Sequence, residues 1–425
     1  MPEPGRFRRA LPSILSVALA LLLCLVGLAI AKGSLPLALE AYGQLFIGGL
    51  GDIGGWLQGG RITLITRPLG ETAIKASLLA LVGLSVAVGF RVGLFNIGAQ
   101  GQMMLGALAA AVVGAQLSLP AWLHVPVCLL VACVAGALWA LPAGVLKLRR
   151  GVHEVISTIM LNWIAISLID NWLAVGPLRA AATLGASRSG TDDVQVTAHL
   201  PRLFGALSRM NFGLVIALSA LVLVWFWLFR SVHGFESRVA GLAPEAAQTA
   251  GIAGERRVLS GFLVSGALAG LAGAVWVLGT EFKYPGSLGA PYGFDGIGIA
   301  LIGQNHPLGV GLSALFFGLM RAGGTRLQLF GVHKSFPELV QGLALLFVAA
   351  NWAWGQLLAR RVRPETGAPG ANGDAMRPPL PPGENRVHGA EAGVGAPNAS
   401  HDDDGATGTG DRTSSPLSKA EGGER

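Results

Sequence analysis

The sequence predicts an all-α protein that crosses a membrane about 8–10 times, and three observations support this fold class. Of the 425 residues, 52% are hydrophobic and 13% are charged, whereas about 25% of the residues in soluble domains are charged. Apolar runs long enough to cross a bilayer as helices recur along the chain. Glycine is abundant, with 62 residues, and Gly266 and Gly270 have the spacing that permits close contact between membrane helices.

The N-terminal residues 1–10 carry several arginines directly before an apolar run from Leu11 to Ala31. Ala29-Ile30-Ala31 fits a signal-peptide cleavage site, but the run is longer than the about 7 to 15 residues of a signal core. We therefore predict an uncleaved first helix whose N-terminus lies in the cytoplasm, because positive charges favour that side.

The remaining spans are predicted where apolar runs lie between polar segments. Residues 32–70 are interrupted by glycine too often to span, and we expect them at the membrane interface. Together with the first helix, the further segments make up a predicted transmembrane domain at residues 11–355. They are about 71–90, the second half of 91–114, 122–146, 155–175, 211–230, 259–280, 293–303, 307–322 and 335–354.

Ten segments would place both termini on the same side of the membrane, which we expect to be the cytoplasm. Lys and Arg near the segment ends are divided almost equally between the two sides, so the N-terminal arginines carry this prediction. Residues 364–425 are rich in Pro, Gly, Ala and Asp and have few large apolar side chains. This composition predicts a disordered cytoplasmic tail.

No catalytic or metal-binding motif occurs in the sequence. The loop G-x-x-x-x-G-K-[ST], which holds nucleotide phosphates, is absent, as are H-E-x-x-H, G-x-S-x-G and paired cysteines. We therefore expect no enzyme activity, no catalytic or metal-binding residues and no cofactor bound by this chain. The net charge is +7, but because Lys and Arg flank apolar runs, membrane lipid is the expected partner and nucleic acid is not.

Polar side chains inside or beside the spans are candidates for a translocation pathway, because such groups are costly in lipid. Neutral amides and hydroxyls outnumber acids there, which favours a neutral polar solute over an ion. Each candidate could instead form a hydrogen bond between helices. The candidates are Asn96, Gln100, Gln102, Thr158, Asn162 and Asp295.

Residues 231–257 form the longest polar stretch between two apolar runs that still has the pattern of a folded segment. Pro244 suits the first position of a helix, and Glu245 suits its first turn, where a negative charge meets the helix dipole favourably. Gly251 suits the position just past the helix end. The residues alone leave two alternatives, a helix on which a partner docks and an ordinary solvated loop.

Several stretches in a fixed order resemble the permease subunits of binding-protein-dependent ABC importers. The group serves branched-chain amino acids, ribose and other simple sugars, and nucleosides, and its nucleoside branch is the most similar. Gln100 stands where that branch has Glu, which argues against a charged role there. The stretches are GLFNIGAQGQ at 93–102, EVISTIMLNWIA at 154–165, GLAPEAAQTAGI at 241–252 and GFDGIGIALIGQNHPLG at 293–309.

The resemblance implies the ABC importer permease fold in a bacterial cytoplasmic (inner) membrane. A second permease subunit, either the same chain or a paralogue, would complete the pathway. Separate ATPase subunits would bind ATP, and an extracytoplasmic lipoprotein would deliver the solute. The coupling loop, 231–258, would contact the ATPases through Gly241, Leu242, Pro244, Glu245, Ala246, Ala247, Gly251 and Ile252.

The resemblance points to a purine nucleoside as the solute, with a simple sugar such as ribose or galactose as the alternative. A self-sufficient secondary transporter is the rival from another class. It predicts paired broken helices in inverted repeats and acids near the midplane. Asp170 and Asp295 are the only suitable acids in the sequence, and it has no clear repeat.

Overall fold

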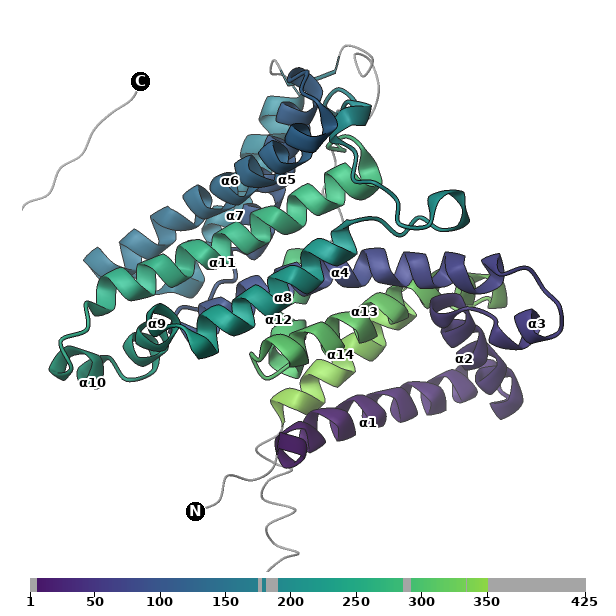
Figure 1. Ribbon diagram of the computed structural model, residues 1–425. Helices are drawn as coiled ribbons and strands as arrows, with labels where there is room; N and C mark the ends of the chain where they lie inside the picture. Colours follow the sequence, from purple (N-terminus) through teal and green to yellow (C-terminus); the bar gives the residue numbers. More distant parts are fainter. Residues whose placement is uncertain (1–5, 175–177, 181–189, 286–291, 334, 351–425) are drawn as a thin grey trace, which may run out of the picture. The chain divides into compact units, whose positions relative to one another are not determined.

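The computed structural model describes residues 6–174, 178–180, 190–285, 292–333 and 335–350 (Figure 1). Most of these residues are helical and none forms a strand, apart from isolated bridges that join Gly190 to Pro285 and Arg202 to Asn211. The predicted disordered tail and residues 1–5 of the predicted cytoplasmic N-terminus lie outside the described residues.

Most helices follow one another along the chain with short connections, and the longest separation is between α7, which ends at Ala174, and α8, which begins at Gly213. The helices are α1 (Arg6–Lys32), α2 (Leu35–Leu50), α3 (Ile53–Leu57), α4 (Thr63–Arg91), α5 (Ala99–Gln116), α6 (Ala121–Arg150), α7 (Glu154–Ala174), α8 (Gly213–Arg230), α9 (Val232–Leu242), α10 (Pro244–Thr249), α11 (Gly254–Trp276), α12 (Tyr292–Ile302), α13 (Pro307–Leu327) and α14 (Phe336–Ala349). Short 3₁₀ turns occur at η2 (Val196–Ala198), η3 (Gly205–Leu207) and η5 (Gln328–Phe330), and η4 (Val277–Glu281) is a π turn.

The predicted class, a helical protein with several membrane spans, is confirmed. Seven helical segments in the described part of the chain are long and apolar enough to cross a membrane. They are Ser13–Lys32, Thr63–Arg91, Ala121–Arg150, Glu154–Trp172, Gly213–Arg230, Gly254–Glu281 and Pro307–Phe330. The apolar helices α12 and α14 are shorter, so a count of about ten spans stays a prediction.

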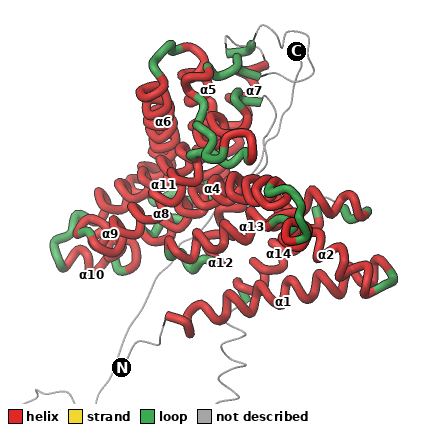
Figure 2. Tube along the Cα trace, turned by 45° about the vertical axis from the view of Figure 1, so that its right-hand side comes forward, coloured by secondary structure: helices red, strands yellow, loops and turns green. Residues whose placement is uncertain are grey.

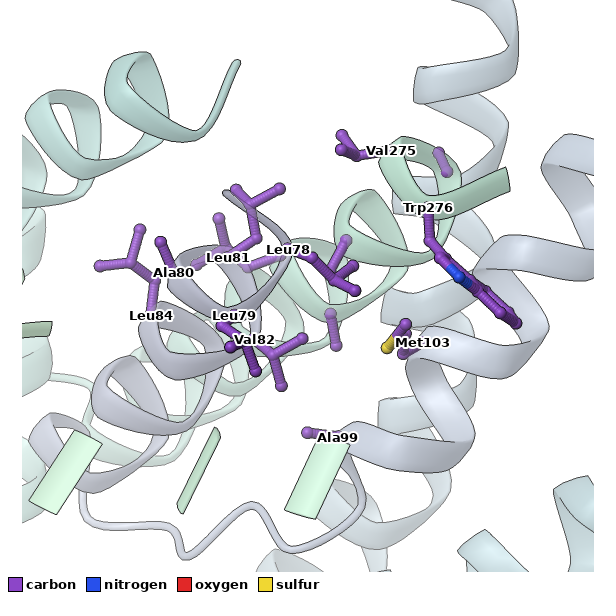
Figure 3. Close-up of a cluster of buried hydrophobic side chains, with 14 of the residues drawn as sticks. Leu78, Leu79, Ala80, Leu81, Val82, Leu84, Ala99, Met103, Val275 and Trp276 are labelled. Atoms are coloured by element: carbon purple, nitrogen blue, oxygen red, sulfur yellow. The ribbon is translucent and has the colours of Figure 1, made fainter. Parts of the chain in front are cut away.

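Helix α4 lies at the centre of the bundle. Its apolar segment is 83% buried by the rest of the chain, compared with 22% for α1 and 28% for α6, α7 and α8. Helices α4 and α11 lie between α5, α6 and α7 on one side and α12, α13 and α14 on the other (Figure 2). Figure 3 shows part of the core that results, where leucines of α4 lie near Met103 of α5 and Trp276 of α11.

Glycine lets the helices around α11 approach closely. A Cβ atom on Gly106 of α5 would lie 2.6 Å from the carbonyl oxygen of Gly270. One on Gly136 of α6 would lie 2.8 Å from the nitrogen of Gly270. A Cβ atom on Gly266 would lie 2.7 Å from the Cβ of Ala140, also on α6. The close contact predicted from the spacing of Gly266 and Gly270 is therefore present, and glycine makes it possible by leaving the helix surface bare.

The glycine-rich part of residues 32–70 forms helix α2, which is not among the seven helical segments long and apolar enough to span. Its predicted place at the membrane interface stays a prediction. Helix α2 is continuous for 16 residues and ends at Gly51, whose φ is +97°. A Cβ atom on Gly48 would lie 2.9 Å from the Cα of Gly323, and one on Gly49 would lie 2.8 Å from the Leu319 side chain. These glycines allow α2 to pack against α13, and this packing offsets their low helix propensity.

Candidate functional site

The predicted coupling loop contains two helices, α9 and α10. Pro244 occupies the first turn of α10 together with Glu245, and Gly251 follows its end with φ +71°. The predicted short helix and both of its ends are therefore confirmed. Helix α9 was not predicted. Its signal was Ser231, a capping residue whose Oγ accepts a hydrogen bond from the Gly234 nitrogen at 3.0 Å.

Helix α10 is held by one face and leaves the other exposed. Ala247 is 1% exposed and belongs to a cluster with residues of α6, α9 and α11, against which Ile252 also packs. Gly241 is partly buried at the end of α9. The remaining predicted coupling residues are exposed, and they are Leu242, Pro244, Glu245, Ala246 and Gly251. The chain thus presents a small, rigidly backed surface at this end of α8 and α11.

The coupling loop is in direct contact with the turn that follows α4. A Cβ atom on Gly93 would lie 2.6 Å from the Cα of Gly241. Gly93 has φ +79°, so glycine suits both its conformation and this approach. Glu236 of α9 also pairs with Arg257 of α11 at 2.5 Å. Both contacts tie the loop to the long helices.

The predicted amides Asn96 and Gln102 form a reciprocal pair below this turn. Asn96 Nδ2 donates to Gln102 Oε1 at 2.8 Å, and Gln102 Nε2 donates to Asn96 Oδ1 at 3.0 Å. Asn96 Nδ2 also donates to Ser265 Oγ at 2.8 Å, and that hydroxyl donates to the Ser85 carbonyl at 2.6 Å. The two serines were not singled out in the sequence, although each is a hydroxyl in the middle of a predicted span. The network joins α4, α5 and α11.

Two further candidates, Asn162 and Gln100, fix the start of α5 to its neighbours, and a third, Thr158, forms its hydrogen bonds within α7. Asn162 of α7 accepts a hydrogen bond from the Gly101 nitrogen at 2.8 Å and donates to the Ile97 carbonyl at 2.9 Å. Gln100 Oε1 accepts from the Gly293 nitrogen of α12 at 2.7 Å. Thr158 Oγ1 donates to the Glu154 carbonyl within α7 at 2.7 Å.

These five candidates are buried and form hydrogen bonds within the protein, the alternative that the sequence left open. None of Asn96, Gln100, Gln102, Thr158 and Asn162 is more than 3% exposed. Buried polar groups that have partners hold helices in one arrangement. Their part in a translocation pathway stays a prediction.

Asp295 lies apart from the other candidates, on α12. Its carboxylate forms an ion pair with Arg321 of α13, and the two side chains are 18% and 13% exposed. The Arg321 guanidinium carbon lies 4.9 Å from the centre of the Tyr292 ring, and Lys75 Nζ donates to the Arg321 carbonyl at 3.1 Å. The sequence singled out Asp295 but not Arg321. Arg321 could have been found in the sequence as a basic residue near the end of the apolar run 307–322, which follows the run that contains Asp295.

Metal chemistry has no assembled ligand set in the described ranges. No group of three or more His, Cys, Asp or Glu side chains gathers there in a way that could hold a metal ion. The predicted pathway candidates instead fall into two groups, the buried amides around Asn96 and Asn162 and the charged groups around Asp295 and Arg321.

Comparison with known proteins gives a consistent result. Residues 68–349 match the family described as "Branched-chain amino acid transport system / permease component". The chain is 39% identical over 290 residues to the guanosine ABC transporter permease protein NupP of Bacillus subtilis, which covers 67% of this chain and 82% of NupP. It is also 26% identical over 288 residues to NupQ of the same organism, which is likewise named a guanosine ABC transporter permease protein. That match covers 64% of this chain and 86% of NupQ.

Two other relatives match over most of their length. The glucose ABC transporter permease protein TsgB13 of Haloferax volcanii is 32% identical over 358 residues, covering 81% of this chain and 90% of TsgB13. The nucleoside ABC transporter permease protein NupB of Lactococcus lactis is 29% identical over 354 residues, covering 82% and 93%. No solved structure matches.

Proposed function

This chain belongs to the family of branched-chain amino acid transport system permease components, and from that premise we propose that it is the membrane-spanning subunit of an ABC uptake system for a nucleoside. The resemblance inferred from short stretches of sequence is thereby confirmed, because the family extends over residues 68–349. In the proposed system this chain binds no cofactor, and separate ATPase subunits bind and hydrolyse ATP.

The nucleoside assignment rests on one observation, the 39% identity with a guanosine permease. The glucose permease is 32% identical, which leaves a simple sugar as the less favoured solute. The excess of amides over acids among the buried polar groups suits a neutral polar solute of either kind. Within the nucleosides, a purine nucleoside agrees with guanosine, the solute for which NupP is named.

The coupling loop is the proposed contact with the ATPases. Its support is the geometry of α10, where Ala247 is buried and Pro244, Glu245 and Ala246 are exposed. Because α10 packs through Ala247 against residues of α6, α9 and α11, it would move together with them. A movement of the ATPases would therefore be transmitted to α9 and to the turn at Gly93. ATP binding would thereby favour one of two arrangements of the pathway.

The second permease subunit is proposed to be a paralogue. Two guanosine permeases of Bacillus subtilis are similar to this chain, at 39% and 26% identity. A difference of that size favours an arrangement in which this chain takes the place of NupP and a separate chain takes the place of NupQ. An extracytoplasmic lipoprotein would deliver the solute on the face away from the coupling loop.

The orientation and the pathway residues complete the proposal. Both termini would lie in the bacterial cytoplasm with the coupling loop, as the N-terminal arginines favour. The buried amides around Asn96 and Asn162 would form a fixed part of the pathway wall, because their hydrogen bonds hold α4, α5, α7 and α11 together. Asp295 would act near the other end of α4, through Arg321.

Reconstitution tests this function. The chain, its paralogue and the ATPases are placed in proteoliposomes with the binding protein added outside, and uptake of labelled guanosine and glucose is measured. Uptake of guanosine that requires ATP inside supports the proposal. Uptake without the ATPases would indicate a secondary transporter, and uptake of glucose but not guanosine would reassign the solute.

A further inference from the structure

A small cavity of about 160 Å³ lies between α4, the start of α8, the end of α11 and the start of α12. Three of its lining residues, Leu78 of α4 and Val275 and Trp276 of α11, are visible in Figure 3. The other lining residues include Glu71, Lys75, Thr280, Glu281 and Tyr292. From Lys75 to the turn at Gly93, α4 extends about 25 Å at 1.5 Å per residue. The cavity is therefore remote from the coupling loop.

The walls of this cavity are unusual for the inside of a membrane bundle because they carry charge. Glu71, Lys75 and Glu281 all line a space that also contains the rings of Trp276 and Tyr292. Glu281 is exposed, and Glu71 is partly exposed and pairs with Arg209 at 3.2 Å. The ammonium of Lys75 is partly buried, and a hydrogen-bond acceptor of a ligand in this space can offset the cost of burying its charge. An ordinary packing defect between membrane helices would have apolar walls.

Contacts among the lining residues and with Arg321 hold the shape of the cavity. Lys75 Nζ donates to the Arg321 carbonyl at 3.1 Å, and the Arg321 guanidinium lies 4.9 Å from the centre of the Tyr292 ring. Asp295 in turn pairs with Arg321. Tyr292 and Trp276 meet nearly edge to face, with ring centres 6.5 Å apart and planes at 66°. Such supporting contacts keep a binding site in one shape before the ligand arrives.

The size of the cavity limits what it can take. Its 160 Å³ is close to the about 150 Å³ of an apolar cavity that binds benzene. One planar ring system therefore fits, and a whole nucleoside does not. The side chain of Tyr292 suits the flat face of such a ring, while the ammonium of Lys75 and the carboxylate of Glu71 suit acceptors and donors along its edge.

We propose that this cavity receives the purine base of the solute during transport, with the ribose left outside it. The inference rests on the proposed function and adds to it the residues that recognise the base. Tyr292 contacts the face of the base, and Trp276, whose ring plane lies at 66° to that of Tyr292, closes the cavity beside it. Lys75 and Glu71, which also pairs with Arg209, bind the edge of the base.

Photolabelling tests the site directly, without the binding protein. The probe is 8-azidoguanosine, applied to the complete permease–ATPase complex, and labelled peptides are identified by mass spectrometry. We expect label on the peptides that contain Trp276 and Tyr292, and we expect excess guanosine but not ribose or glucose to block it. Tyr292→Leu should lower labelling about tenfold, the loss expected for one base–aromatic contact, and Tyr292→Phe should not.

Lys75→Gln should change the ratio of the guanosine and adenosine concentrations that halve labelling by about threefold or more. Guanine and adenine carry different donors and acceptors along the edge that Lys75 is proposed to bind. Lys32→Gln is the matched control. Lys32 Nζ also donates to a backbone carbonyl, that of Phe330 at 2.9 Å, but it does not line the cavity. The control should leave the ratio unchanged.

Two results would overturn the proposal. Label on other peptides, with guanosine uptake intact in proteoliposomes, would reject the cavity and leave the proposed function standing. Label that ribose blocks as well as guanosine would assign the cavity to a sugar. Absence of guanosine uptake would instead reject the proposed function, and the base site with it.

Discussion

Gly93 and Gly241 meet backbone to backbone, with 2.6 Å between a Cβ atom built on Gly93 and the Cα of Gly241. Gly93 belongs to the turn after α4, whose apolar segment is the most buried of the seven candidate spans, and Gly241 belongs to the end of α9 in the coupling loop. Neither position has room for a side chain. A movement of the loop therefore reaches α4 through the backbone itself, without depending on flexible side chains.

We expect Gly241→Ala to uncouple ATP hydrolysis from transport. The added methyl would lie 2.5 Å from the Gly93 nitrogen, so the two segments must separate, at a cost of about 1–3 kcal/mol. Uptake per ATP hydrolysed, measured in proteoliposomes, should fall at least about fivefold. Gly254→Ala is the control, because its methyl would lie 3.8 Å from Ala240, an ordinary contact. Equal coupling in the two variants would remove the role of this contact.

The exposed face of α10 predicts a docking defect without a folding defect. The double variant Glu245→Arg and Ala246→Arg should lower the amount of ATPase that copurifies with the permease about tenfold. Both residues are exposed, so the new bulk and charge would lie in the proposed contact with the ATPases. The melting temperature in detergent should not change. Val196→Arg, at a position 81% exposed and outside the loop, should leave recovery intact. If the double variant recovers ATPases normally, α10 is not the contact.

The reciprocal amide pair predicts a coupled loss of stability. Asn96→Ala leaves the buried amide of Gln102 without its partner, which costs about 1–3 kcal/mol. The same holds for Gln102→Ala, since the two hydrogen bonds join the same groups. Unfolding in detergent should show that the double variant loses less than the sum of the single variants. Gln58→Ala, at an exposed position, should lie within about 0.5 kcal/mol of the native chain. Strict additivity would contradict the pairing.

The ion pair between Asp295 and Arg321 predicts rescue by exchange of charge. With both side chains less than 20% exposed, Asp295→Asn leaves a largely buried cation unpaired and should cost about 3 kcal/mol. Asp295→Arg combined with Arg321→Asp should recover part of that loss, and thermal unfolding measures both. The exposed pair of Lys283 and Asp193, at 3.7 Å, provides the control, because Asp193→Asn should cost less than about 1 kcal/mol. A double variant less stable than either single variant would argue against a direct pair.

Much of the fold followed from local sequence. Pro244 and Gly251 predicted the ends of α10 because helix ends depend on residues within one turn. The glycines of α2 show the opposite case. Gly48 and Gly49 lie within a helix, and their role depends on contacts with Gly323 and Leu319 of the distant helix α13.

The candidate site was predicted in part. Asn96, Gln102 and Asn162 were singled out as candidates for a translocation pathway, because amides inside apolar runs stand out in any sequence. They are buried and form hydrogen bonds within the protein, and their part in a pathway stays a prediction. Their partners did not stand out, since Ser85 and Ser265 are common residues in membrane helices. The charged cavity was missed as a site, and Lys75 and Tyr292 meet there although they are far apart in the chain.

The class of the protein, its apolar helices and the short helix of the coupling loop could be predicted from local sequence, because hydrophobicity and helix ends depend on a few neighbouring residues. Which polar groups face one another depends instead on how the helices pack. Hydrogen bonds such as that from Asn96 to Ser265, and the meeting of Gly93 with Gly241, join residues from different helices. Such pairs exist only after packing has set the distances between the helices.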